Sequence, residues 1–161
     1  TQLPGFLLDN DEFTPMLNLV RANAYENGDF SLSAMYHTKA IEANPSDDLA
    51  YISRGKALLR TGAHSQARQD FIKALQLNAE RKEAFYLIGN SLFHEGKYKD
   101  AIGFYEQYLS VDAGYENVWF NAAMAYLNLK DEEKSCEYLQ KASKLGMNQA
   151  DAMIAKHCDS Q

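Results

Sequence analysis

Four histidines and two cysteines are the side chains of this 161-residue chain that are best suited to chemistry. An imidazole acts as a general base or a metal ligand where a nucleophile or further ligands stand at a fixed spacing from it. The histidines are scattered instead, and none lies in an HExxH, GxSxG or phosphate-loop pattern. They are His37, His64, His94 and His157. His64 and His94 flank predicted turns, so we expect both to face solvent.

The remaining polar clusters have structural explanations. Asp47-Asp48 and Asp131-Glu132-Glu133 precede predicted helices, where acids cap the helix and oppose its dipole. Cys136 and Cys158 are 22 residues apart and form no CxxC motif, which argues against a zinc site. The sequence therefore predicts a protein that is not an enzyme, with no catalytic residue, metal or cofactor.

Composition narrows the class of partner. Lys and Arg number 16 against 22 Asp and Glu, for a net charge of −6, so the chain lacks the positive charge with which nucleic-acid binders neutralise phosphates. No apolar run approaches the roughly 20 residues that cross a bilayer. We expect no nucleic acid and no membrane insertion. Few Gly and Pro, with abundant Ala, Leu, Glu and Lys, favour helix.

The elements that carry these residues repeat with a period of 34. Gly28, Gly62 and Gly96 fall 34 residues apart in polar breaks, and a fourth break at Lys130-Asp131 comes 34 residues later without glycine. Glycine just past a helix supplies the left-handed residue that ends it. One such break in each period predicts two short antiparallel helices per unit.

Side-chain volume follows the same register. A large apolar residue recurs near the start of each first helix, and four residues later three units have a very small residue, at Gly55, Gly89 and Ala123. The large residues are Leu17, Tyr51, Phe85, Trp119 and Met153. Where two helices cross closely, one face shrinks so that a ring from the other can fill the space.

This pattern resembles the tetratricopeptide repeat (TPR) family, most fully over residues 49–78 and 83–112. The resemblance implies an all-α fold, a right-handed superhelical α-solenoid of antiparallel helix pairs. Its four units span 14–47, 48–81, 82–115 and 116–149. Residues 150–161 are then a C-terminal capping helix and tail. Residues 1–13 form a lead segment, for which a cap on the first helix, a disordered remnant and a segment occupying a groove all remain open.

The resemblance also implies a concave groove lined by the first helix of each pair, where rings and amides hold a peptide. The predicted lining is Tyr25, Ile52, Lys56, Arg60, Tyr86, Asn90, Phe93, Phe120, Asn121, Met124 and Asn128. We expect a scaffold that binds a peptide or partner protein there, or alternatively a structural module that forms homo-oligomers through its ends or groove. One TPR subclass grips chaperone C-termini, but Tyr86, Asp151 and Ala155 stand where its cations belong, so we do not expect that activity.

The first inter-repeat seam departs from the family pattern. Arg21 replaces a small residue, His37 an aromatic and Arg54 an aliphatic, and the three could approach one another. Two guanidinium groups beside an imidazole predict a carboxylate, water or bound anion nearby. The competing interpretation is a partly exposed seam from which the long side chains reach water.

The two cysteines fall at the same end of two antiparallel helices in this arrangement. A Cys136–Cys158 disulfide is feasible, and the pair looks like the C-terminal arrangement of some bacterial exported TPR proteins. An oxidised pair argues for a periplasmic or secreted location. The alternative is two buried free thiols and a cytoplasmic protein.

Overall fold

The computed structural model describes residues 23–158, which form helices and turns with no strand in that range. None of the described helices is long and apolar enough to cross a membrane. The helices are α2 (Phe30–Ala43), α3 (Asp48–Arg60), α4 (His64–Leu77), α5 (Lys82–His94), α6 (Tyr98–Val111), α7 (Glu116–Asn128), α8 (Glu132–Lys144) and α9 (Asn148–His157). The all-α class predicted from the repeat is confirmed.

The turn inside each helix pair uses a left-handed residue. Gly28, Gly62 and Gly96 have φ of 79°, 82° and 75°, a region that glycine enters without steric cost. Lys130 occupies the fourth such position and has φ of 61°, the one positive value at a non-glycine residue among the described residues. The 34-residue spacing therefore records a repeated backbone requirement.

Close helix crossing explains the small residues of the first helices. A Cβ placed on Gly89 would lie 2.5 Å from a ring carbon of Tyr105, which is 1% exposed. Gly55 has the same relation to Phe71, which is fully buried. Each ring thus occupies the space left by the missing side chain, and this contact joins α3 to α4 and α5 to α6.

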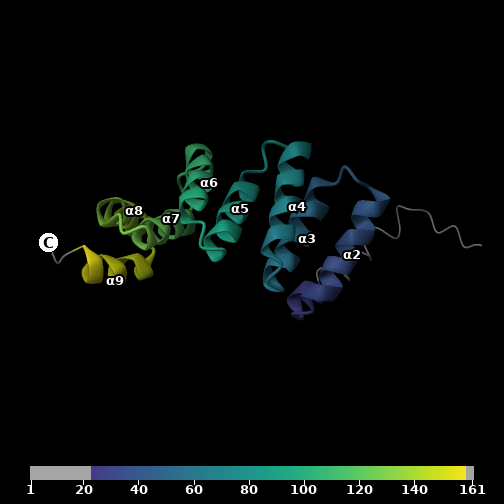
Figure 1. Cartoon of the computed structure of the whole chain (residues 1–161), viewed down its shortest axis with the longest axis horizontal. Helices are drawn as coiled ribbons and strands as arrows, with labels where there is room; N and C mark the ends of the chain where they lie inside the picture. Colours follow the sequence, from purple (N-terminus) through teal and green to yellow (C-terminus); the bar gives the residue numbers. More distant parts are fainter. Residues whose placement is uncertain (1–22, 159–161) are drawn as a thin grey trace, which may run out of the picture.

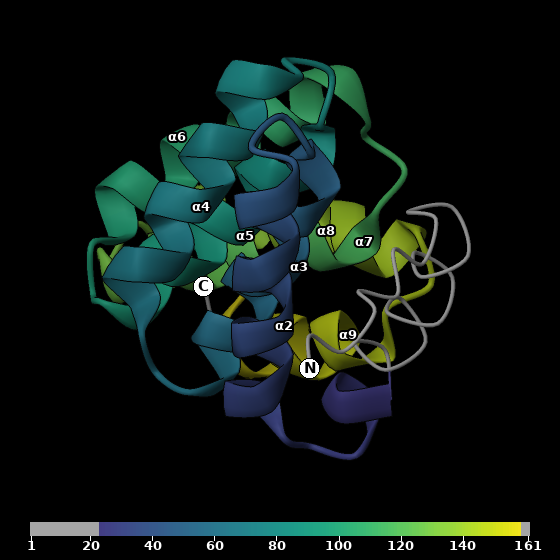
Figure 2. The same cartoon turned by 90° about the vertical axis from the view of Figure 1, so that its right-hand side faces the viewer.

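The pairs stack in sequence along one axis. Each helix packs chiefly on the helices before and after it in the chain, so that α2 and α9 lie at opposite ends of the long axis (Figure 1). A view turned by 90° looks along that axis, with successive pairs one behind another (Figure 2). This is the nearest-neighbour architecture of a solenoid.

The last helix covers the apolar side of the last pair. Ala150 of α9 is fully buried against Leu139 and Ala142 of α8, and Met153 and Ile154 pack on the edge of the same cluster. A solenoid exposes an apolar face at each end unless a further helix covers it. In this chain α9 covers that face at the C-terminal end.

Candidate peptide-binding groove

The first helices form the inner layer of the stack. The helix α5 contacts both α3 and α7, whereas the described second helices α4, α6 and α8 pack less closely on one another. Layers that approach more closely lie on the inside of the curve. The surface of α3, α5 and α7 that carries the predicted lining is called the groove below.

A hydrogen-bonded group of two amides and a phenol occupies the middle of the groove. The Nδ2 group of Asn121, on α7, donates to Oδ1 of Asn90, on α5, at 3.0 Å, and to the hydroxyl of Tyr86 at 3.3 Å. All three side chains are half-buried. The structure thus brings together three of the predicted lining residues.

The amide of Asn90 also accepts a hydrogen bond from a residue of the core. The hydroxyl of Tyr105, on α6, donates to Oδ1 of Asn90 at 2.9 Å, so this oxygen accepts two hydrogen bonds. Among the described residues, no acceptor is bonded to Nδ2 of Asn90 and no donor to Oδ1 of Asn121. The pair therefore has one donor group and one acceptor group left for a ligand.

Further tyrosine rings support this centre. The ring of Tyr86 contacts those of Tyr108 and Tyr115, with centroids 6.1 Å and 5.5 Å away. Burial raises the pKa of both Tyr108 and Tyr115 above the ordinary value for a phenol. Lys82 and Asp112 form an ion pair at 2.6 Å next to Tyr108. The Tyr86 ring is thus surrounded by contacts from its own chain.

The N-terminal part of the groove carries its cations in contacts within the chain. Lys56 on α3 forms an ion pair with Glu83 on α5. The guanidinium of Arg60 lies 4.4 Å from the centroid of the Phe30 ring, and the Tyr25 ring meets the same phenylalanine at 5.1 Å. These cations bridge adjacent units.

The C-terminal part is apolar with amides. Phe120 and Met124 on α7 are half-buried, and Nδ2 of Asn128 donates to the backbone oxygen of Met124 at 2.8 Å. Phe93 on α5 packs edge-on against Tyr98, with centroids 5.2 Å apart. This part of the groove presents apolar area without a formal charge.

The prediction that Ile52 lines the groove is wrong. Its side chain is 2% exposed and belongs to the main apolar core. Counting around a helix gives the direction in which a side chain points, and the approach of the neighbouring helices then determines how much of that side chain is covered.

The predicted cation seam contains a carboxylate. The guanidinium of Arg54 binds both oxygens of Asp70, at 2.8 Å and 2.6 Å, and donates to Thr38 at 3.3 Å. The hydrogen bonds to Asp70 raise the pKa of Arg54. Thr38 follows His37 on α2, and Arg21 lies outside the described residues. Arg54 is thus neutralised within the chain.

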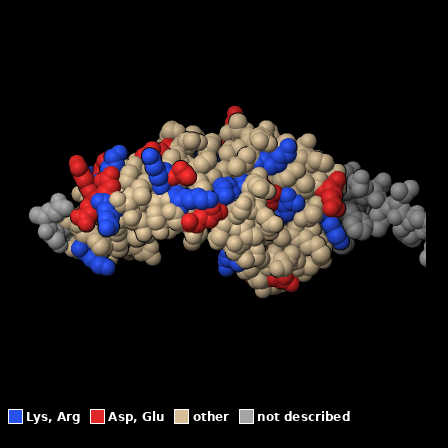
Figure 3. All heavy atoms as spheres, in the orientation of Figure 1, with Lys and Arg blue, Asp and Glu red and all other residues tan. Residues whose placement is uncertain are grey.

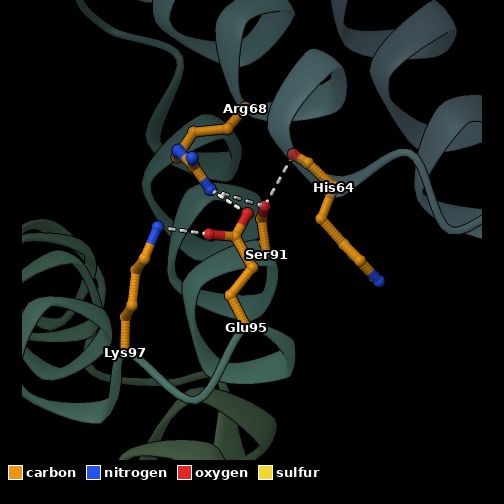
Figure 4. Close-up of polar contacts among 5 residues, drawn as sticks. All are labelled: His64, Arg68, Ser91, Glu95 and Lys97. Atoms are coloured by element: carbon orange, nitrogen blue, oxygen red, sulfur yellow. Dashed lines mark hydrogen bonds and ion pairs between the residues drawn. The ribbon is translucent and has the colours of Figure 1, made fainter.

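A second polar seam joins units two and three (Figure 4). Arg68 on α4 pairs with Glu95, which also binds Lys97 at 2.6 Å, and these two cations lower the pKa of Glu95. The hydroxyl of Ser91 donates to the backbone oxygen of His64 at 2.9 Å. Intramolecular pairs of this kind leave acidic and basic side chains interspersed on the face drawn in Figure 3.

The expectation that His64 and His94 both face solvent holds for one of them. His94 is exposed, but His64 is half-buried, and the two rings stack with centroids 5.4 Å apart. No group of three or more metal-ligating side chains occurs in the described part of the chain.

Cys136 and Cys158 form a disulfide, with their Cα atoms 5.8 Å apart. Cys136 is in the second turn of α8, and Cys158 caps the C-terminus of α9. The bond therefore ties the far end of the capping helix to the body of the fourth unit.

Sequence reasoning missed several interaction partners in the groove and in the seam. Tyr105, Glu83 and Asp70 complete the bonding of Asn90, Lys56 and Arg54, respectively. Tyr105 carried a visible signal, since a tyrosine stands where the preceding unit has Phe71. The two carboxylates carried none, because acidic residues are common at every position of a helical sequence.

Comparison with known proteins identifies the class. One family model of the tetratricopeptide repeat matches residues 23–79 and 53–117, and a second model of the same repeat matches residues 116–145. The matches cover most of the chain, which therefore belongs to the tetratricopeptide repeat family. This confirms the family predicted from the 34-residue period.

Curated relatives share the repeats over part of their length. Small glutamine-rich tetratricopeptide repeat-containing protein 2 of Mycosarcoma maydis is 28% identical over 88 residues, which are 55% of this chain and 25% of that protein. Human serine/threonine-protein phosphatase 5 is 31% identical over 91 residues, or 56% of this chain and 17% of that protein. The chain thus spans a quarter or less of these relatives.

Solved structures share the fold. MamA from Desulfovibrio magneticus RS-1, residues 41 to the end, superposes with a TM-score of 0.77 at 22% identity, covering 82% of this chain and 75% of that one. The Arabidopsis OM64 TPR domain gives 0.67 at 20% identity, covering 71% and 94%. TPR proteins generally mediate protein–protein interactions, and their scaffold is typically non-catalytic.

Proposed function

We propose that this chain is a non-enzymatic interaction scaffold that binds an extended peptide segment of a partner protein along the groove. The amide pair in the middle of the groove is the observation that carries the proposal. Among residues 23–158 nothing bonds one donor and one acceptor of this pair, and an extended peptide backbone brings one of each that need partners.

The surroundings of the pair favour a peptide over a charged small molecule. Phe93, Phe120 and Met124 supply half-buried apolar area for side chains of the ligand. Lys56 is neutralised by the Glu83 carboxylate and therefore offers little to a free anion, and the guanidinium of Arg60 lies over the Phe30 ring. A neutral or weakly charged segment fits this lining.

Selection from a random library tests the proposal without a known partner. Phage-displayed 12-residue peptides are selected on the disulfide-bonded protein, and a selected peptide is then titrated by fluorescence anisotropy. We expect Asn90→Ala and Phe120→Ala each to weaken binding about tenfold, the equivalent of about 1.4 kcal/mol. Gln107→Ala, an exposed change on the outer helix α6, is the matched control and should leave the affinity unchanged.

Two outcomes would contradict the groove as the binding site. One is equal binding by the wild-type protein and both groove variants. The other is a molar mass by light scattering that rises with concentration and falls to the monomer in the groove variants. The second outcome would support self-association, the alternative function.

We also propose that the protein works in an oxidising compartment, periplasmic or secreted. The Cys136–Cys158 bond supports this, since disulfides are rare where glutathione and thioredoxin keep thiols reduced. Blocking thiols with a maleimide in intact cells before lysis tests the location. A protein that takes up two maleimide groups under denaturing conditions would contradict it.

A further inference from the structure

The equivalent position in the preceding unit is filled by a ring that has no hydroxyl, in contrast to Tyr105. Phe71 stands 34 residues earlier, and it fills the space over Gly55 as Tyr105 fills the space over Gly89. Both rings are buried, so a plain phenyl ring meets the steric demand of this position. The residue that faces the ring in the groove differs, because Lys56 in unit two stands where unit three has Asn90.

A buried phenol must donate its proton. Tyr105 is 1% exposed, and an unsatisfied buried hydroxyl is costly. The acceptor that the structure provides is Oδ1 of Asn90, at 2.9 Å. Burial raises the pKa of Tyr105 far above its ordinary value, so the phenol stays protonated and remains a donor. If the Asn90 amide turned over, the phenol proton would lose this acceptor.

We infer that Tyr105 is a positioning residue that fixes the orientation of the Asn90 amide and thereby the hydrogen-bonding polarity of the groove. With Oδ1 of Asn90 turned toward the core, Nδ2 is the group left for a ligand. Because Asn121 donates its Nδ2 group to the same Oδ1, its own Oδ1 is left as well. The groove then presents a donor on α5 and an acceptor on α7.

This inference rests on the proposed function and specifies the ligand further. A peptide carbonyl belongs opposite Asn90, and a peptide N–H belongs opposite Asn121. Turning both amides over would exchange the two roles and favour a backbone shifted or reversed along the groove. Tyr105 therefore restricts the register of an extended peptide while lying outside the surface that the peptide touches.

The ligand-free protein gives a direct test by NMR. In the wild type, the Nδ2 protons of Asn121 should exchange slowly with water and those of Asn90 rapidly. Tyr105→Phe, which reproduces the situation of Phe71, should keep the backbone spectrum and make the two exchange rates similar. Unchanged rates in a folded Tyr105→Phe protein would overturn the inference, whatever the protein binds.

Peptide binding separates this inference from the proposed function. With a library-selected 12-residue peptide, Asn90→Asp exchanges the outward donor for an acceptor, and we expect at least tenfold weaker binding. Tyr105→Phe should weaken binding threefold to tenfold. If Asn90→Asp weakens binding but Tyr105→Phe binds like the wild type, the groove stands and the role of Tyr105 falls. If the wild type selects no peptide, the proposed function fails, and the exchange rates still decide the role of Tyr105 in orienting the amide.

Discussion

Lys130 occupies the turn position at which the three preceding turns have glycine. Its φ of 61° places its backbone in the left-handed region, where the Cβ of an L-residue crowds the following carbonyl oxygen. Lys130 is exposed, so burial does not compensate for this strain. The three preceding turns meet the same backbone requirement with glycine and without this cost.

Lys130→Gly should therefore stabilise the protein. We expect the free energy of unfolding to rise by about 1 kcal/mol, since glycine adopts this conformation without a Cβ clash. Urea denaturation of the oxidised protein measures the change. Gly96→Ala, in the equivalent turn, should lower stability by a similar amount, and a Lys130→Gly protein less stable than wild type would show that the lysine makes a compensating contact.

Among the elements, α6, α7 and α8 meet at one carboxylate. The hydroxyls of Tyr126 on α7 and Tyr138 on α8 donate to the same oxygen of Glu106 on α6, at 2.8 Å and 3.1 Å. Burial and the Glu106 charge raise the pKa of Tyr138 to about 12, and the pKa of Tyr126 is raised as well. The protonated phenols hold the three helices together.

This contact predicts alkaline sensitivity. Below about pH 10 the tyrosines are protonated in both the folded and unfolded chain, so the contribution to stability is complete. Between about pH 10 and 12 the unfolded chain releases protons that the folded protein retains, and stability falls. Urea midpoints measured from pH 9 to 11.5 should decrease, and the decrease should be smaller in Tyr138→Phe. An identical pH dependence in the two proteins would argue against the contact.

Sequence reasoning predicted the helices and their pairing more completely than the contacts between side chains. The spacing of Gly28, Gly62 and Gly96 predicts the paired helices because the turn needs a specific backbone conformation, which depends on local sequence. The partners of Asn90 and Arg54 escaped prediction, because a hydrogen bond between helices depends on rotamers and crossing geometry. Ile52 was misassigned for a related reason, since the period gives the face of a helix and leaves burial undetermined.

At the scale of the whole molecule, the disulfide acts on one end only. It joins residues 22 apart, and closing such a loop contributes about 3 kcal/mol by restricting the unfolded chain. Since stability in a solenoid is the sum of units and their nearest-neighbour contacts, the effect should be greatest in α8 and α9.

Reduction of the disulfide should therefore destabilise the capping helix α9 more than the other helices. In the reduced protein, or in the Cys136→Ser/Cys158→Ser variant, we expect faster amide exchange in α9 and nearly unchanged exchange in α3 to α5. Hydrogen exchange read by mass spectrometry resolves the two regions. A uniform increase along the chain would indicate that the described units unfold together and that the ends are not independent.

Because each helix packs chiefly on its neighbours in the chain, α3 and α7 have little direct hold on one another. A peptide lying from Lys56 to Met124 would contact both helices at once and would connect units two and four, which otherwise touch chiefly through unit three. A bound peptide would then make the solenoid stiffer. The partner would alter the distance between the two ends of the solenoid through small shifts at several helices.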